Sequence, residues 1–287
     1  QDIREHNVDD INRVLRRGPG VNLREEDGYG LFPNISLRGV DSARASKVTV
    51  MEDGILMAPA PYSAPSAYYS PTTGRMAAIE ILKGSSQVKY GPHTTGGAIN
   101  YLSTRIPSSE KVYSKSSFGM FNEIRNHTYF GNTEQLGSGK FGYLIEYYKR
   151  STTGFKEMDT VPEVRDSHEA DTGFSKSEPM VKLFFEPKSN LYQRIEAKFG
   201  YTNLDANETY TGISTNDFRV DPNRRYLGSR FDEIETTQFR QHIRHFIEFN
   251  PKTSLVTTAY GNTFNRNWQK LASVNGNNLS SSGLTSA

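Results

Sequence analysis

One stretch of sequence decides the fold class: Leu191-Tyr-Gln-Arg-Ile-Glu-Ala-Lys-Phe-Gly-Tyr201. In a β-strand, every second side chain falls on the same face. One face of this stretch therefore carries Leu191, Ile195, Ala197, Phe199 and Tyr201, and the other carries Arg194, Glu196 and Lys198. The stretch is predicted to be a strand that separates an apolar environment from a wet one.

The same alternation recurs on both sides of this stretch. Phe141, Tyr143, Ile145 and Tyr147 share one face, and ranges 181–186 and 239–249 repeat the pattern. We predict about seven strands, near residues 112–119, 123–132, 140–150, 177–186, 190–203, 235–249 and 253–268. Short connections at 187–190 and 250–254 alternate with long polar ones at 152–176 and 204–234, as is typical of an outer-membrane β-barrel.

A soluble antiparallel sandwich is the alternative, because each of its sheets also buries one apolar face. Two features favour the barrel. The predicted strands exceed the usual length of ~5–6 residues. Charged residues of both signs occupy one face of several strands, as a water-filled lumen allows.

The composition agrees with a β-rich chain. Only 35% of the 287 residues are hydrophobic, whereas Gly (24), Tyr (16) and Phe (16) are abundant. No apolar run approaches the ~18 residues that a membrane-spanning helix needs. The 34 basic and 32 acidic side chains nearly balance, which argues against a nucleic-acid partner, and the absence of cysteine excludes disulfides and thiolate metal sites.

Residues 1–105 have a different, mixed α/β character. Asp9 or Asp10 can cap a short helix whose apolar positions are Ile11, Val14 and Leu15. Short strands are predicted at 34–38, 47–51 and 78–83, with Asp53-Gly54 as a hairpin turn. The proline-rich range 58–65 is predicted to be an exposed loop.

Catalytic signatures are missing, so we expect neither an enzyme nor a bound cofactor. His168-Glu169 lacks the second histidine of a zinc-protease helix. The segment Gly137-Ser-Gly-Lys140 imitates a phosphate-binding loop, but Glu134 and Phe141 stand where that motif needs Gly and Ser or Thr.

Four motifs of the N-terminal region occur in a fixed order: Asn34-Ile-Ser-Leu-Arg-Gly39, Val48-Thr-Val-Met-Glu-Asp-Gly54, Ile79-Glu-Ile-Leu-Lys-Gly84 and Tyr90-Gly-Pro-His-Thr-Thr-Gly-Gly-Ala-Ile-Asn100. Together they resemble the plug motifs of TonB-dependent receptors. The resemblance implies a mixed α/β plug domain at residues 1–105, followed at 106–287 by the N-terminal part of an antiparallel transmembrane β-barrel. About seven of the 22 strands of such a barrel are present, so the chain is expected to be part of a longer receptor.

The resemblance also implies roles for single residues. Arg38 and Lys83 match basic plug residues that pair with barrel carboxylates, and those carboxylates are expected beyond residue 287. Lys83 stands where arginine is frequent, which disfavours a bidentate pair. Plug turns are expected at the following glycines: Gly39, Gly54, Gly84, Gly91, Gly96 and Gly97.

The loop Ala60-Pro-Tyr-Ser-Ala-Pro65 is most similar to the ferric-citrate branch of the family. By that resemblance, Tyr29 and Ala64 match the plug apices that contact ligand, with Tyr62 and Ser63 as neighbours that could substitute. Arg266, or Asn265 in an ungapped match, falls near a barrel arginine that binds the anionic chelate. Ala64 stands where a polar amide is expected, which favours iron chelates in general over citrate itself.

The function implied by the resemblance is active import of a ferric chelate across the outer membrane. The implied partners are the TonB–ExbB–ExbD complex, the chelate and outer-membrane lipid, and a monomer is expected. Two alternatives stay open: a receptor for another nutrient, such as a different siderophore, cobalamin or an oligosaccharide, and a soluble β-rich binding or adhesion protein.

Overall fold

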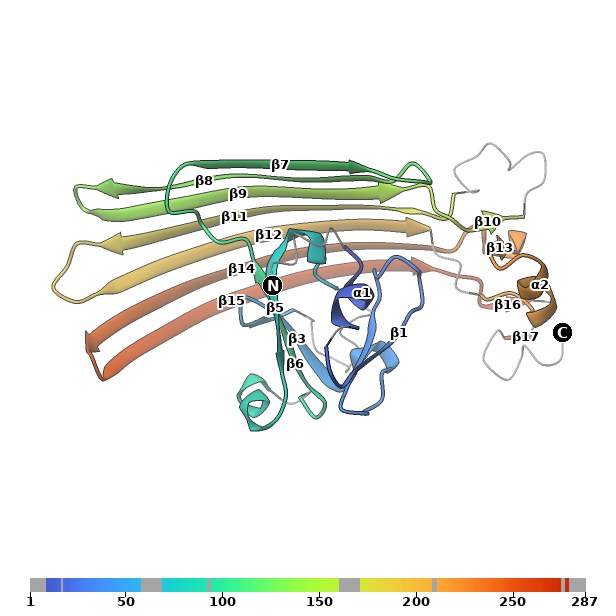
Figure 1. Cartoon of the computed structure of the whole chain (residues 1–287), viewed down its shortest axis with the longest axis horizontal. Coiled ribbons are helices and arrows are strands. Elements are labelled where there is room, and N and C mark those ends of the chain that lie inside the picture. Colours follow the sequence, from blue (N-terminus) through green and yellow to red (C-terminus); the bar gives the residue numbers. More distant parts are fainter. Residues whose placement is uncertain are drawn as a thin grey trace.

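The computed structural model describes residues 9–16, 18–57, 69–91, 94–159, 171–207, 211–274 and 277–278. Two parts are visible in Figure 1. A small N-terminal unit, from α1 to β6, lies against one face of a sheet of seven long strands, which we call the wall.

The N-terminal unit begins with α1 (Ile11–Leu15), and the Asp10 side chain accepts a hydrogen bond from the Asn12 amide at 2.8 Å. This contact is the predicted helix cap. Strands β1 (Val21–Arg24) and β2 (Asn34–Leu37) form an antiparallel pair. A four-stranded sheet follows in the order β4 (Ile55–Leu56), β3 (Val48–Glu52), β6 (Gly97–Ser103) and β5 (Met76–Leu82).

The core of this unit is apolar and closely packed. Its members are Ile11, Leu15, Ile35, Leu37, Ala45, Val48, Val50, Met57, Tyr69, Met76, Ile99 and Tyr101. The helix, three of the strands and the Asp53-Gly54 turn were predicted. Strands β1, β4 and β6 were not, and β6 escaped because it is buried along almost its whole length and shows no alternation. The predicted proline-rich loop lies outside the described residues.

The wall confirms the prediction of seven strands. They run antiparallel in sequence order: β7 (Lys111–Phe118), β8 (Ile124–Leu136), β9 (Gly139–Thr152), β11 (Phe174–Pro187), β12 (Gln193–Asn207), β14 (Glu233–Asn250) and β15 (Thr253–Gln269).

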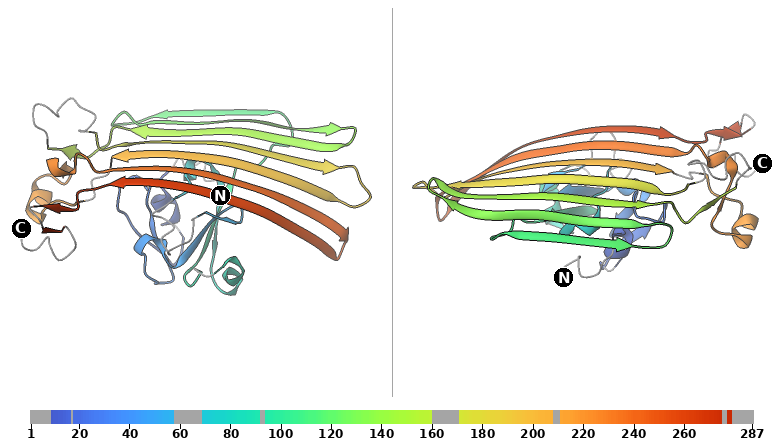
Figure 2. Two further views of the ribbon diagram at one scale, coloured as in Figure 1. Left: turned by 180° about the vertical axis from the view of Figure 1, so that it is seen from behind. Right: turned by 90° about the horizontal axis from the view of Figure 1, so that it is seen from above.

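The connections differ at the two ends of the wall, as Figures 1 and 2 show. Short links join β8 to β9, β11 to β12 and β14 to β15 at one end, the short-turn end. The opposite end, the loop end, carries small elements of the long connections: β10 (Glu157–Met158), α2 (Thr215–Val220), β13 (Arg224–Arg225), β16 (Ser273–Val274) and β17 (Asn277–Asn278).

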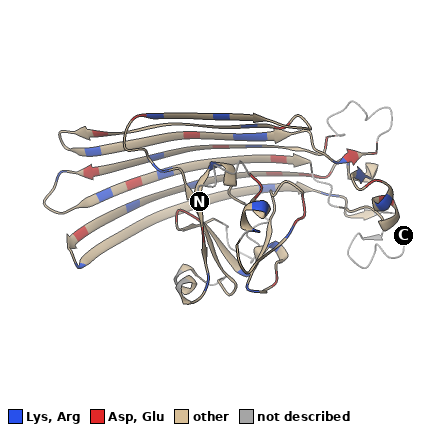
Figure 3. Cartoon of the chain, in the orientation of Figure 1, with Lys and Arg blue, Asp and Glu red and all other residues tan. Residues whose placement is uncertain are grey.

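The two faces of the wall have opposite character. On the outer face, Ile145 is 55% exposed and Ile243 is 52% exposed. On the inner face, Leu144, Glu146 and Lys198 are buried. Figure 3 shows charges of both signs along the strands. Among the described residues, no helix is long and apolar enough to cross a membrane.

Two glycines are required by local geometry. In the β3–β4 turn, Asp53 and Gly54 both have positive φ values, 52° and 80°, which are the values of a tight hairpin turn. At Gly97 (φ 151°), an added Cβ would lie 2.7 Å from the Leu82 carbonyl oxygen and 2.4 Å from the Leu37 side chain. Gly39, Gly84 and Gly91 also have positive φ values, and Gly96 lies close to the Lys47 carbonyl.

We predict that Gly97→Ala destabilises the N-terminal unit by about 1–3 kcal/mol, because the new methyl group meets backbone that cannot move aside. Gly39→Ala is the matched control: its φ is 78° but nothing lies within 4 Å of the added Cβ. Hydrogen–deuterium exchange of the β3 and β6 amides measures the loss of stability in both variants. Equal protection in the two variants would contradict the predicted clash.

Candidate functional site

A cluster of buried charges joins the N-terminal unit to the wall. Its members, here called the ion cluster, are Glu52, Asp53 and Arg75 from the N-terminal unit and Glu178, Lys182, Lys198 and Arg240 from the wall. The fold brings them together because Glu52 ends β3 and the wall residues lie on the inner face of neighbouring strands.

Arg75 lies at the centre of the ion cluster, with 1% of its side chain exposed. It forms a two-pronged contact with Glu52, Nη1 to Oε1 at 3.0 Å and Nη2 to Oε2 at 2.9 Å. Its Nε lies 3.2 Å from Glu178 Oε1 on the wall. The Tyr69 hydroxyl accepts from Arg75 at 2.7 Å and donates to Glu178 at 2.9 Å, so this cation is held between two carboxylates and a phenol.

Three basic residues of the wall converge on the β3–β4 turn. Lys198 Nζ lies 2.6 Å from Asp53 Oδ2 and also donates to Glu52 Oε1 at 2.5 Å. Lys182 Nζ lies 3.4 Å from Asp53 Oδ2, and Arg244 Nη2 donates to the Asp53 carbonyl at 2.9 Å. These residues come from β11, β12 and β14, so three neighbouring strands hold one turn.

The charges shift the pKa values of the buried groups in the N-terminal unit. Burial alone would raise the pKa of Glu52, but the Arg75 guanidinium and the Lys198 ammonium outweigh burial and hold it well below its usual range. Burial opposes ionisation of Asp53 as well, and the same lysine together with Lys182 lowers the pKa of that carboxyl. Both acids are therefore ionised at neutral pH.

Backbone contacts extend this polar interface. Gln238 Nε2 donates to the Met57 carbonyl at 2.8 Å, and Lys176 Nζ donates to the Ser70 carbonyl at 2.8 Å. Lys182 donates to the Thr104 carbonyl at 2.9 Å. This part of the interface is thus held largely by hydrogen bonds and ion pairs, which water can replace when the two surfaces separate.

A second site lies at the loop end, where the segment 27–32 meets the wall. Its apolar residues, the outer cluster, are Tyr29, Leu31, Phe32, Phe174, Leu204, Ala206, Ile234 and Trp268. The Asp27 carboxylate fixes the segment by accepting from the amides of Tyr29 at 2.5 Å and Phe32 at 2.9 Å. Arg150 donates to the Tyr29 carbonyl at 3.2 Å, with its guanidinium 5.8 Å from the Tyr29 ring centroid.

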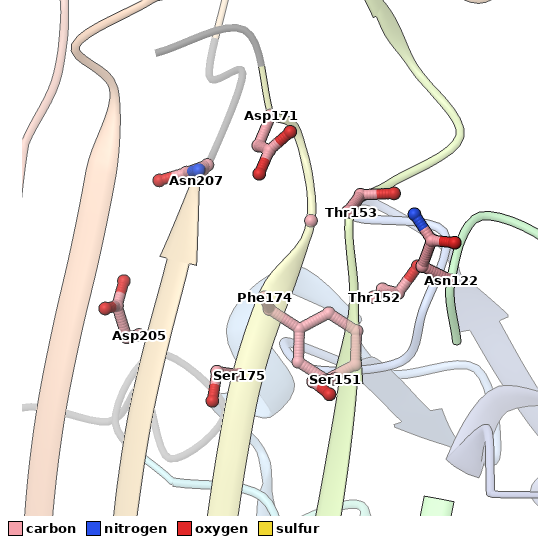
Figure 4. A pocket seen from close by; sticks show the side chains of 10 residues that line it. Asn122, Ser151, Thr152, Thr153, Asp171, Phe174, Ser175, Asp205 and Asn207 are labelled. Carbon is pink, nitrogen blue, oxygen red and sulfur yellow. The ribbon is translucent and has the colours of Figure 1, made fainter. Parts of the chain in front are cut away.

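Two cavities lie at this end. One of about 190 Å³ is lined by Tyr29 and Phe32, with Lys156 and Arg225 as its basic residues. The other, of about 220 Å³, lies at the ends of β9, β11 and β12 (Figure 4) and is lined mainly by short polar side chains. Asp205 of this cavity also lies near Glu233 and Glu235, with their oxygens within 4.8 Å of one another, a grouping that could hold a cation.

Known proteins show the same architecture. Residues 1–98 match the family described as TonB-dependent Receptor Plug Domain. The structure of the ferric citrate transporter FecA in the unliganded form matches with a TM-score of 0.71 and 20% identity, over 90% of this chain and 37% of that chain. The ferric yersiniabactin uptake receptor FyuA from Yersinia pestis matches with a TM-score of 0.69 and 18% identity, over 95% of this chain and 42% of that chain.

The chain has the fold of a TonB-dependent receptor. The N-terminal unit is the plug of this fold, and the wall is part of its barrel. A third structure, the siderophore receptor PirA from Acinetobacter baumannii, matches with a TM-score of 0.58 and 13% identity, over 92% of this chain and 39% of that chain. The chain spans about two fifths of the length of these receptors, all of which are named as transporters or receptors.

The structure places some predicted ligand residues close together. Arg266 lies on the inner face of β15, opposite Thr236, and its guanidinium lies 5.5 Å from the Trp268 ring centroid. Trp268 and Tyr29 both belong to the outer cluster, so the predicted residues Tyr29 and Arg266 lie in one region. Tyr62, Ser63 and Ala64 lie outside the described residues. The ligand-binding role of all five stays a prediction.

Arg38 and Lys83, which were predicted to pair with barrel carboxylates, form hydrogen bonds within the plug in the described part of the chain. Arg38 is exposed and donates to plug atoms, the carbonyls of Thr95 and Gly96 at 3.4 Å and the side chain of Gln87 at 3.5 Å. Lys83 donates to the Pro19 carbonyl. The pairing of Arg38 and Lys83 with barrel carboxylates stays a prediction. In the described part of the chain, Arg75 forms an ion pair from the plug to the wall, with Glu178. Its local sequence, Thr72-Thr-Gly-Arg75, carries no signal for this role; the only hint was the charged inner face predicted for the strands.

We predict that Arg75→Met destabilises the docked plug by about 3–5 kcal/mol, because it leaves Glu52 and Glu178 buried without their shared cation. The control is Arg16→Met, which removes an exposed arginine paired with Glu25 and should cost less than about 1 kcal/mol. Thermal unfolding of the two variants measures the difference. An Arg75→Met protein as stable as the control would rule out a structural role for this cation.

A pH dependence follows from the lowered pKa values of Glu52 and Asp53. The unfolded chain binds these two protons more tightly than the folded state does, so the stabilisation is fully present above the ordinary carboxyl pKa of about 4. This stabilisation is lost as the pH falls toward the lower pKa values that Glu52 and Asp53 have in the folded state. At pH values below about 4, the unfolding temperature should decrease as the pH is lowered. The decrease should be less steep in Glu52→Gln than in the unmodified protein. Identical slopes in the two proteins would contradict the assignment.

Proposed function

We propose that this chain forms the plug domain (residues 1–105) and the first part of the barrel (residues 106–287) of an outer-membrane receptor that imports a ferric chelate. In this proposal the chelate binds between the plug apex and the loops at the loop end. The TonB–ExbB–ExbD complex supplies the energy for import, and the receptor acts as a monomer.

The observation that carries the proposal is the outer cluster with its surrounding cations. Tyr29 of the plug meets Phe174 of the wall there, and Arg150 lies within 6 Å of both ring centroids. Lys156 and Arg225 line the adjoining cavity together with Glu26 and Asp27, and the Asp27 carboxylate is occupied by the amides of Tyr29 and Phe32. A site that combines aromatic faces with cations suits an anionic chelate that has apolar parts. The names of two matched receptors, for ferric citrate and ferric yersiniabactin, support the same class of ligand.

The outer face of the wall supports a membrane location. Its exposed apolar side chains, such as Ile145, Phe199 and Ile243, would lie against lipid in an outer-membrane barrel. A soluble binding protein would need another surface to cover this face. The aromatic content of the outer cluster favours a different siderophore as the second candidate ligand if citrate fails to bind.

Ligand titration of the complete, detergent-solubilised receptor tests the proposal, with ferric citrate, iron-free citrate and an unrelated ferric siderophore as ligands. Arg266→Ala should weaken binding of the preferred ferric chelate by roughly tenfold or more, as the loss of a hydrogen bond to a charged group does. Arg16→Ala, which removes an exposed arginine that does not line the cavity of Tyr29 and Phe32, is the matched control. If no iron complex binds, the proposed ligand class is wrong.

A further inference from the structure

A third cavity, of about 570 Å³, lies between the plug and the wall on the short-turn side of the ion cluster. The β3–β4 turn forms one side of it, and strands β11, β12 and β14 form the other. Five basic residues line the cavity, Arg105, Lys182, Arg194, Lys198 and Arg244, against two carboxylates, Asp53 and Glu196. Arg194 pairs with Glu186 and Glu196, and Lys198 pairs with Glu52 and Asp53, so the positive charge left facing this space comes from Arg105, Lys182 and Arg244.

The donors of these basic residues are not all committed to the protein. Arginine carries five N–H groups. Among the described residues, Arg244 donates to the Asp53 carbonyl and to Thr258 Oγ1, at 2.9 and 3.4 Å. Lys182 donates to the Thr104 carbonyl and lies 3.4 Å from Asp53. Spare charged donors in a confined space are the usual setting for carboxylate or phosphate oxygens.

We infer that this cavity is a second anion-binding site, which takes a small polyanion through carboxylate or phosphate oxygens. The inference goes beyond the proposed function, because the site is separated from the outer cluster by the ion cluster. Lys182 and Arg244 both line the cavity and hold the Asp53 turn. A bound polyanion therefore competes with Asp53 for the same cations and loosens the hold of the wall on the plug.

Calorimetric titration of the complete, detergent-solubilised receptor at fixed ionic strength tests the site, with iron-free citrate and inorganic phosphate as separate probes. Arg244→Gln and Lys182→Gln should each weaken binding by roughly tenfold, the effect of losing one charged contact. Asp53→Asn should tighten binding, because it removes the competing carboxylate. Binding of citrate alone would define a polycarboxylate site, and binding of both probes a general oxyanion site.

Two controls separate this site from other effects. Lys149→Gln changes a lysine that donates to Ser175 Oγ at 2.6 Å and does not line the cavity, so it should leave binding unchanged. Arg266→Ala should also leave anion binding at the cavity unchanged, even if it abolishes binding of the ferric chelate. The two proposals can therefore fail separately.

Hydrogen–deuterium exchange provides an independent measurement of the competition. Citrate should increase exchange at Gly54, whose amide donates to Asn100 Oδ1 at 2.8 Å beside the held turn. The increase should be absent in Arg244→Gln. The inference is overturned if neither probe binds, or if folded Arg244→Gln and Lys182→Gln proteins bind both probes as tightly as the unmodified receptor does.

Discussion

The buried guanidinium of Arg75 is the constraint on which the docking of plug and wall depends. A charge removed from water is tolerated only where opposite charges and hydrogen bonds replace the lost hydration. For Arg75, the opposite charges are Glu52 within the plug and Glu178 on the wall. The plug therefore reaches full pairing of its buried charges only when it is seated against this part of the sheet.

The division of charge between the two surfaces explains why they fit. Next to Arg75, the plug presents the adjacent acids Glu52 and Asp53, whereas the inner face of the wall presents an excess of lysine and arginine. Apolar residues of similar volume would hold the two surfaces together at least as firmly. The ion cluster instead fixes the orientation of the plug against the wall, and water can replace its contacts when the two surfaces separate. This suits a plug that has to move during the proposed import.

The sequence predicted the architecture well and the contacts poorly. Alternation such as that of Leu191 to Tyr201 is local, so it identified the seven strands and the inward position of Lys198 without any knowledge of the tertiary structure. Strand β6 was missed because burial on both faces removes the alternation. The pairing of Arg75 with Glu178 was missed for another reason: the two residues are distant in sequence, and only the docking of two units brings them together. Tyr29 and Arg266 were selected by resemblance, and their place beside the outer cluster could not be derived from spacing.

Strand β12 connects the three regions of the interface. Its inner face carries Leu204 and Ala206 at the outer cluster, then Lys198 in the ion cluster, and finally Glu196 and Arg194 at the third cavity, between plug and wall. Because inward side chains recur every second residue, this order is set by the strand itself and does not depend on the loops. A solute that passed along this strand would leave an aromatic site and meet the cations that hold the plug turn before it reached the short-turn end. The residues that would attract an anion in that path are the residues that hold the plug, so in the proposed import the passage of an anion and the release of the turn would be coupled by charge.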